Sequence, residues 1–242
     1  MIRNIFSTAV FLAVICSFTA SQAQDGMHNW TGFYVGVHGG VVDGEANSKG
    51  LTTGNFGQGN AAPGVEFSID TTGAFGGGQI GYNYQMNNFV AGLEVDFGGL
   101  GADGTQLGFP NAPAGQDDTG MNTSYGAYGV VAGRLGLAVE NSLFYVKGGL
   151  ALAQVDFKAG DLDTGVFDPN DVTSFDDWLT GYAVGGGFEY AFASNWSLKA
   201  EYLYLGFEKN SLETPPGVGV TDGRYENSFD LHTFKVGLNY NF

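Results

Sequence analysis

The feature of this sequence that most constrains its fold is an alternation of apolar with small or polar residues in runs of strand length. In residues 89–97, for example, Leu93 shares one face with four other apolar residues, while Glu94 lies on the opposite face. Residues 234–242 repeat the pattern. Because successive side chains of a strand point to opposite faces, a period of two predicts strands with one apolar face. No segment shows a convincing helical period.

The same pattern recurs along the chain, and its spacing predicts how the strands connect. We expect eight strands, at about 31–42, 71–85, 89–98, 123–139, 142–157, 175–192, 196–208 and 229–242. Three connections are tight, namely Met86-Asn87, Glu140-Asn141 and Ala193-Ser194-Asn195. The other four are long and polar, around 43–70, 99–122, 158–174 and 209–228. This layout is typical of an all-β, closed antiparallel up-and-down transmembrane β-barrel in a bacterial outer membrane, with periplasmic turns and termini and extracellular long loops.

A soluble antiparallel barrel is the alternative, and it would turn its apolar face inward. Its outer face would then need scattered charge to stay soluble. Here the non-apolar face is mostly Gly, Ala and Asn, and charged residues make up only 14 % of a chain with 41 glycines. The membrane interpretation is therefore favoured.

The N-terminus has the order of a secretion signal. Arg3 precedes an apolar run over residues 5–18, and residues 21–23 (SQA) supply the small residues of a cleavage site. The run is shorter than the ~20 residues that a helix needs to cross a bilayer. We therefore expect a signal peptide at 1–23 and an outer-membrane β-barrel domain at 24–242.

Cleavage at this site would also remove Cys16, the only cysteine of the chain. The mature protein would then have no disulfide and no thiolate metal ligand. Its net charge would change from −16 to −17 with the loss of Arg3. So acidic a balance disfavours nucleic acid as a partner.

The face opposite the apolar one holds four acids and four bases, which we expect to form a charge network in the lumen. They are Glu94, Asp96, Arg134, Lys147, Glu189, Lys199, Glu201 and Lys235. A three-residue turn at 193–195 would place Glu189 opposite Lys199, so we expect these two side chains to form an ion pair. A two-residue turn at 140–141 would place Arg134 opposite Lys147, so that both would need carboxylates from across the lumen.

These charges lie five to seven residues from the short turns, which corresponds to about 12–18 Å along a tilted strand. Eight strands enclose a space that side chains can fill. We therefore favour a salt-bridged plug. A selectivity constriction for solutes remains the alternative, because inward glycines such as Gly92 and Gly237 leave room for water.

Aromatic residues predict two water–lipid boundaries, because Trp and Tyr favour the headgroup level. We assign Trp30, Tyr190 and Trp196 to a girdle near the short turns, and Trp178 to one near the long loops.

Enzyme chemistry finds little support. None of the histidines, His28, His38 and His232, has a metal-ligand spacing or an adjacent Ser nucleophile. The acidic stretch 161–165 falls short of a calcium-binding EF-hand loop. We therefore expect no catalytic residues, no metal site and no cofactor.

Several segments resemble one known family. They are residues 29–36 (NWTGFYVG), 76–84 (GGGQIGYNY), 187–192 (GFEYAF) and 195–204 (NWSLKAEYLY). These segments are similar to the small porin-like outer-membrane proteins of alphaproteobacteria, which have an OmpA-type eight-stranded barrel and include major surface antigens and haemin-binding proteins. The resemblance covers most strands and none of the long loops.

The resemblance implies a location in the cell outer membrane and an envelope-structural and surface-interaction role without catalysis. The alternatives are a passive small-solute porin and a haemin-binding surface protein. The implied partners are outer-membrane lipid and lipopolysaccharide, the barrel assembly machinery, and haemin or host surface molecules bound through the long loops. Leu238, Tyr240 and Phe242 end the last strand as an outward series, which resembles the signal that this machinery recognises.

Overall fold

The computed structural model of the chain consists of antiparallel strands. It describes residues 28–51, 54–56, 59–61, 64, 66–107, 119–163, 166–213 and 224–242. The strands are β1 (Gly32–Gly50), β2 (Gly54–Phe56), β3 (Gly59–Ala61), β4 (Glu66–Met86), β5 (Phe89–Leu107), β6 (Thr119–Val139), β7 (Ser142–Asp163), β8 (Val166–Ala193), β9 (Trp196–Phe207), β10 (Asn210–Glu213) and β11 (Arg224–Asn241). The predicted signal peptide lies outside the described residues. No helix among the described residues is long and apolar enough to cross a membrane.

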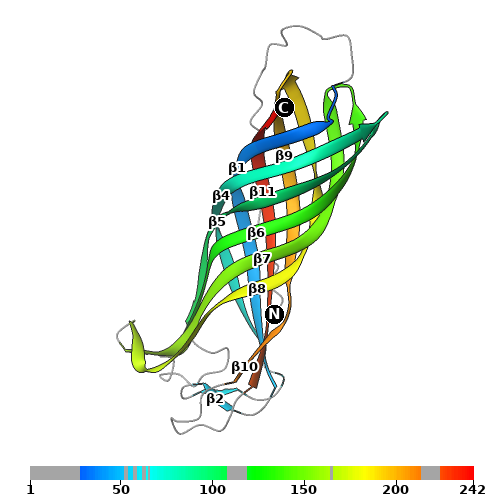
Figure 1. Cartoon of the computed structure of the whole chain (residues 1–242). Helices are drawn as coiled ribbons and strands as arrows, with labels where there is room; N and C mark the ends of the chain where they lie inside the picture. The colour runs from blue at the N-terminus through cyan, green and yellow to red at the C-terminus, as the bar shows by residue number, and fades with distance from the viewer. Residues whose placement is uncertain are drawn as a thin grey trace, which may run out of the picture.

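The long strands form one closed barrel (Figure 1). Each pairs with its neighbour in sequence, and β11 pairs with β1 to complete the wall. β9 and β10 follow one another along β11, so together they form one wall strand. β2 and β3 make a separate small hairpin. The predicted closed, eight-stranded up-and-down barrel is confirmed.

The short turns and the C-terminus lie at one end of the barrel. The backbone N–H of Asn241 donates to the carbonyl of Asn195 in a short turn at 2.7 Å. β2 and β10 lie at the opposite end (Figure 1). Because turns of outer-membrane barrels face the periplasm, the first end is the periplasmic one.

Two of the predicted turns differ from those observed. The β4–β5 turn is formed by Asn87 and Asn88, because β4 includes Met86. The β8–β9 turn has two residues rather than three, and Ala193 pairs with Trp196. An irregularity between residues 191 and 193 absorbs the extra residue, so the rest of the predicted register is preserved.

The strands run several residues further into the long-loop end than predicted, and the reason is a reversal of the apolar face. Up to Val41, the large side chains on the outward face of β1 are apolar and exposed, and they belong to the hydrophobic band of the outer wall. Beyond it, outward Asp43 and Glu45 are exposed, whereas inward Val42 and Ala46 are buried. A search for one continuous apolar face therefore ends each strand at the reversal, although backbone pairing continues.

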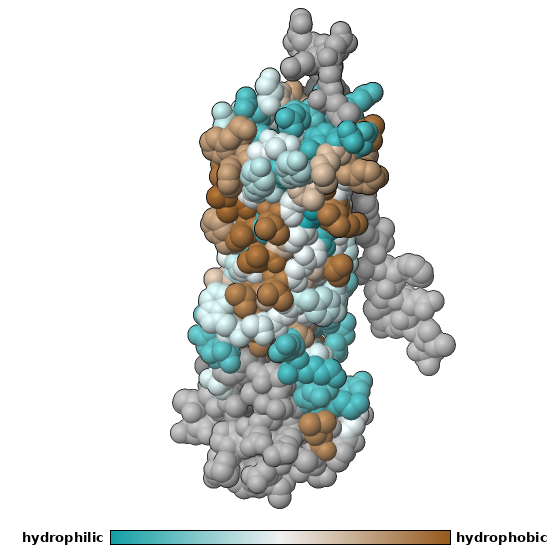
Figure 2. Space-filling model, turned by 45° about the vertical axis from the view of Figure 1, so that its right-hand side comes forward, coloured by the Kyte–Doolittle hydropathy of each residue, from teal (hydrophilic) through white to brown (hydrophobic). Residues whose placement is uncertain are grey.

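The outer wall is apolar where the barrel crosses the membrane. Figure 2 shows hydrophobic side chains gathered over the middle of the wall and hydrophilic ones towards both ends. Large apolar side chains such as Leu93, Leu135 and Leu150 are 68 %, 65 % and 72 % exposed. In water such a surface would aggregate, whereas lipid covers it without cost.

Side chains fill the lumen in three successive layers, which β7 shows in order. Leu143 and Tyr145 belong to an apolar cluster next to the short turns. Lys147 follows in a charged layer, and then Ala151 and Val155 belong to a larger apolar cluster that extends towards the long loops. The packed core therefore lies inside the barrel, as in a soluble protein.

Candidate functional site

The charged layer of the lumen brings all eight predicted ionisable side chains together. None is more than 4 % exposed. Each lies within 3.5 Å of an opposite charge, and the contacts join all of them into one network. Four acids and four bases make the layer neutral when all are ionised. This balance matters because an unpaired charge is costly to bury.

Arg134 on β6 joins two carboxylates on the periplasmic side of the layer. Its Nη1 lies 3.3 Å from Glu94 Oε2 and 3.2 Å from Glu189 Oε2. The guanidinium also lies between the rings of Tyr34 and Tyr145, 4.7 Å and 5.0 Å from their centroids. A delocalised cation held between two aromatic faces is fixed in position on both sides.

Lysines surround the carboxylates of Glu94, Asp96 and Glu201. Lys147 Nζ contacts Glu94, Asp96 and Glu201. Lys235 Nζ lies 2.6 Å from Asp96 Oδ1 and 2.8 Å from Glu201 Oε1. The three carboxylates have oxygens within 4.8 Å of one another, a spacing that would suit a metal ion. Here ammonium groups supply the positive charge instead.

The predicted strand register of Glu189 and Lys199 is confirmed, but the predicted ion pair between their side chains is wrong. The two residues are backbone partners on β8 and β9. Their side chains diverge, however, because Glu189 reaches Arg134 while Lys199 Nζ lies 2.8 Å from Glu94 Oε1. Arg134 and Lys147 are also backbone partners, and both bind carboxylates from across the lumen as expected.

Neutral polar side chains complete the layer, and the sequence reasoning missed them. The hydroxyls of Tyr34 and Tyr145 donate to Glu94 at 2.6 Å and to Glu201 at 2.7 Å. Ser197 Oγ and Asn239 Nδ2 donate to Glu189 Oε1 at 2.6 Å and 2.7 Å. All of them have inward parity on their strands, so that parity is the signal that could have identified them.

His38 caps the layer on the long-loop side. Its two ring nitrogens contact Gln79 Oε1 and Tyr128 Oη, and Nδ1 lies 4.0 Å from Asp96. His38 therefore lies on the inward face of β1. His232 is exposed on the outer wall, where Nδ1 lies 2.7 Å from the hydroxyl of Tyr202.

Trp30 does not belong to the outer girdle, and that prediction is wrong. It is 2 % exposed and packs in the periplasmic apolar cluster with Val90 and Leu143. The reason is parity, because Trp30 shares the even numbering of the inward residues Tyr34 and His38. Its backbone N–H donates to Gln85 at 2.8 Å, which holds the segment before β1 inside the barrel mouth.

The other predicted boundary residues lie on the outer wall. Trp178, Tyr190 and Trp196 are 52 %, 44 % and 41 % exposed. At the C-terminus, Phe242 is 72 % exposed, and its ring lies 5.2 Å from that of Tyr240. The roles of these residues in the membrane girdle and in assembly stay predictions.

Comparisons with known proteins found similarity to outer-membrane proteins. The family described as "Outer membrane protein beta-barrel domain" matches residues 9–242. The 31 kDa outer-membrane immunogenic protein of Brucella melitensis is 34 % identical over 88 % of this chain and 84 % of its own length. The 22 kDa outer membrane protein of Rhizobium leguminosarum is 28 % identical over 88 % and 79 %. The crystal structure of OprG from Pseudomonas aeruginosa is 13 % identical, covers 90 % of this chain and 98 % of its own, and has a TM-score of 0.49.

Proposed function

Since this chain belongs to the outer membrane protein β-barrel domain family and lies in the outer membrane, we propose that it is an envelope-structural and surface-interaction protein without catalysis. The observation that carries this proposal is the filled lumen. A buried charge network lies between two apolar layers, so packed side chains fill the path that water or a solute would take along the barrel axis. An internal cavity of about 10 Å³ beside Asp96 and Lys235 has room for about one water molecule.

The length of the wall supports a role at the cell surface. A strand of about 9–11 residues crosses an outer membrane, whereas β1, β4 and β7 have 19, 21 and 22 residues. The excess of eight or more residues carries the barrel about 20 Å beyond the bilayer at the usual rise and tilt. The name of the Brucella relative describes that protein as immunogenic, which fits display on the surface.

Conductance separates this proposal from the passive-porin alternative. Folded protein in a planar bilayer should give no stable open levels, and liposomes that contain it should swell in sugar solutions no faster than protein-free liposomes. Reproducible open levels of uniform size would contradict the proposal and favour the pore.

Surface display has its own test, which uses an epitope tag inserted after the exposed turn residue Gly64. Antibody should label intact cells that carry this tag. The matched control places the tag between Asn87 and Asn88, in a periplasmic turn, where labelling should require permeabilised cells. The reverse labelling pattern would overturn the proposed orientation.

A further inference from the structure

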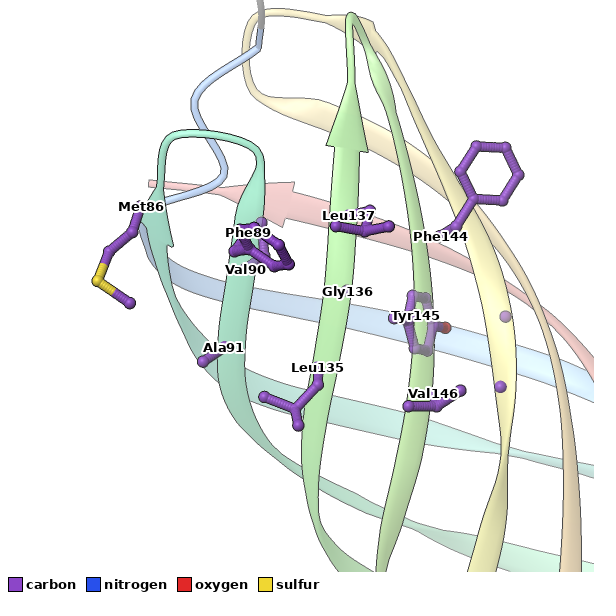
Figure 3. Close-up of a pocket in the computed structure, with 12 residues that line it drawn as sticks. Met86, Phe89, Val90, Ala91, Leu135, Gly136, Leu137, Phe144, Tyr145 and Val146 are labelled. Atoms are coloured by element: carbon purple, nitrogen blue, oxygen red, sulfur yellow. The ribbon is translucent and has the colours of Figure 1, made fainter.

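A groove in the outer wall has the form of a binding site. It has a volume of about 870 Å³ and is lined by residues of β4 to β8 at the short-turn end (Figure 3). Met86 and Phe144 stand at opposite margins in Figure 3, with Leu137 between them. Among the described residues that line it, none is charged. An occupant must therefore be apolar where it enters the groove.

Glycines form the floor of the groove. A Cβ added at Gly186 would lie 2.7 Å from the carbonyl oxygen of Tyr145, and one at Gly187 would lie 2.6 Å from the carbonyl oxygen of Ala200. Larger side chains at either glycine would thus clash with the wall. The depression is therefore built into the backbone of the barrel and does not depend on the rotamer of a flexible side chain.

The position of the groove on the wall indicates that lipid, rather than water, surrounds it. It begins beside the Asn87-Asn88 turn and runs along the β6–β7 hairpin away from the turn at Glu140. Neighbouring outward residues such as Leu93 and Leu150 are among the most exposed apolar side chains of the wall. The groove therefore opens into hydrocarbon on the periplasmic side, where the inner leaflet supplies phospholipid acyl chains.

The charge at the mouth of the groove selects the headgroup. Glu140 is exposed at the tip of the β6–β7 hairpin, and its carboxylate makes no ion pair among the described residues. The turn is held in place because the carbonyl oxygen of Glu140 accepts a hydrogen bond from the backbone of His28 at 3.1 Å. The described lysines and arginines lie either in the charged layer of the lumen or between that layer and the long-loop end. They are Lys49, Arg134, Lys147, Lys158, Lys199, Lys209, Arg224 and Lys235.

We propose that this groove seats the acyl chains of an inner-leaflet phospholipid whose amine-bearing, zwitterionic headgroup places its ammonium beside Glu140. An anionic headgroup would meet a carboxylate and, among the described residues, no neighbouring lysine or arginine. Phosphatidylethanolamine has the required chemistry, and phosphatidylglycerol with the same chains is the matched competitor.

Native mass spectrometry of the folded protein tests this with both lipids. Wild type should retain one phosphatidylethanolamine after mild delipidation, with a preference of about two- to fivefold over phosphatidylglycerol, as expected of an exposed ion pair. Ala91→Phe fills the groove and should abolish retention. Ala127→Phe is the matched control, because Ala127 is exposed on the outer wall but does not line the groove. Glu140→Gln should keep the lipid and lose the headgroup preference.

A second measurement avoids any dependence on folding of the variants. Phosphatidylethanolamine with a photoreactive acyl chain should crosslink wild type within residues 86–91, 135–137 and 144–146 rather than on β1. Equal retention by Ala91→Phe, equal binding of phosphatidylglycerol, or uniform crosslinking around the barrel would each overturn the proposal. Retention of lipopolysaccharide or a second copy of the chain at the groove would do the same.

Discussion

Arg134 and Glu189 should behave as an energetically coupled pair. Their charged atoms lie 3.2 Å apart, and both side chains are 1 % exposed. At an effective dielectric constant of about 20, this separation corresponds to an attraction of about 5 kcal/mol. Desolvation offsets much of it, but loss of one partner leaves a buried charge and typically costs about 3–5 kcal/mol. Arg134→Met and Glu189→Gln should therefore each be strongly destabilising.

The double variant should be less destabilised than the sum of the single variants. Removing both partners leaves three acids and three bases, so the layer is again neutral. We expect a coupling energy of about 1–3 kcal/mol. Arg134 also contacts Tyr34 and Tyr145, and these contacts are lost both in Arg134→Met and in the double variant. Their contribution therefore cancels in the double-mutant cycle.

Reversible urea unfolding in lipid vesicles, followed by Trp fluorescence, measures the four free energies of unfolding. Glu189 with Lys199 is the matched control cycle, because these residues are backbone partners whose charges bind elsewhere. Its coupling should be clearly smaller. Additivity within about 0.5 kcal/mol for Arg134 and Glu189, or equal coupling in the two cycles, would refute the assignment of contacts.

Three further predictions concern the wall and the two ends of the chain. Boiled and unboiled folded protein should migrate differently in gels, because β1 pairs with β11 and leaves no edge strand where unfolding can start; identical mobility would contradict this closure. Deletion of Phe242, which is 72 % exposed, should lower the amount that reaches the outer membrane but leave refolding in detergent nearly intact; normal yield in cells would exclude the assembly signal. Intact mass should show a mature N-terminus at Gln24, and retention of residues 1–23 would disprove the cleavage site.

The architecture was predictable from the sequence because lipid outside and a packed lumen inside impose opposite requirements on alternate residues. The alternation in residues 89–97 is enough to place Glu94 inside and Leu93 outside, as observed. The strand ends were less predictable. At the membrane surface the apolar face changes from outward Val41 to inward Val42, and the pattern no longer marks a single continuous face.

By itself the sequence determined the class of fold, the closed order of strands and the set of charged side chains that share the lumen. Only the tertiary structure decided which acid meets which base, because register aligns neighbouring strands whereas long side chains meet across the lumen. Glu189 faces Lys199 in register and yet binds Arg134. The glycine floor beneath the outer groove was also decided by the tertiary structure. The contact of Glu189 on β8 with Arg134 on β6 depends on the closed wall, which brings together side chains of strands that are not neighbours.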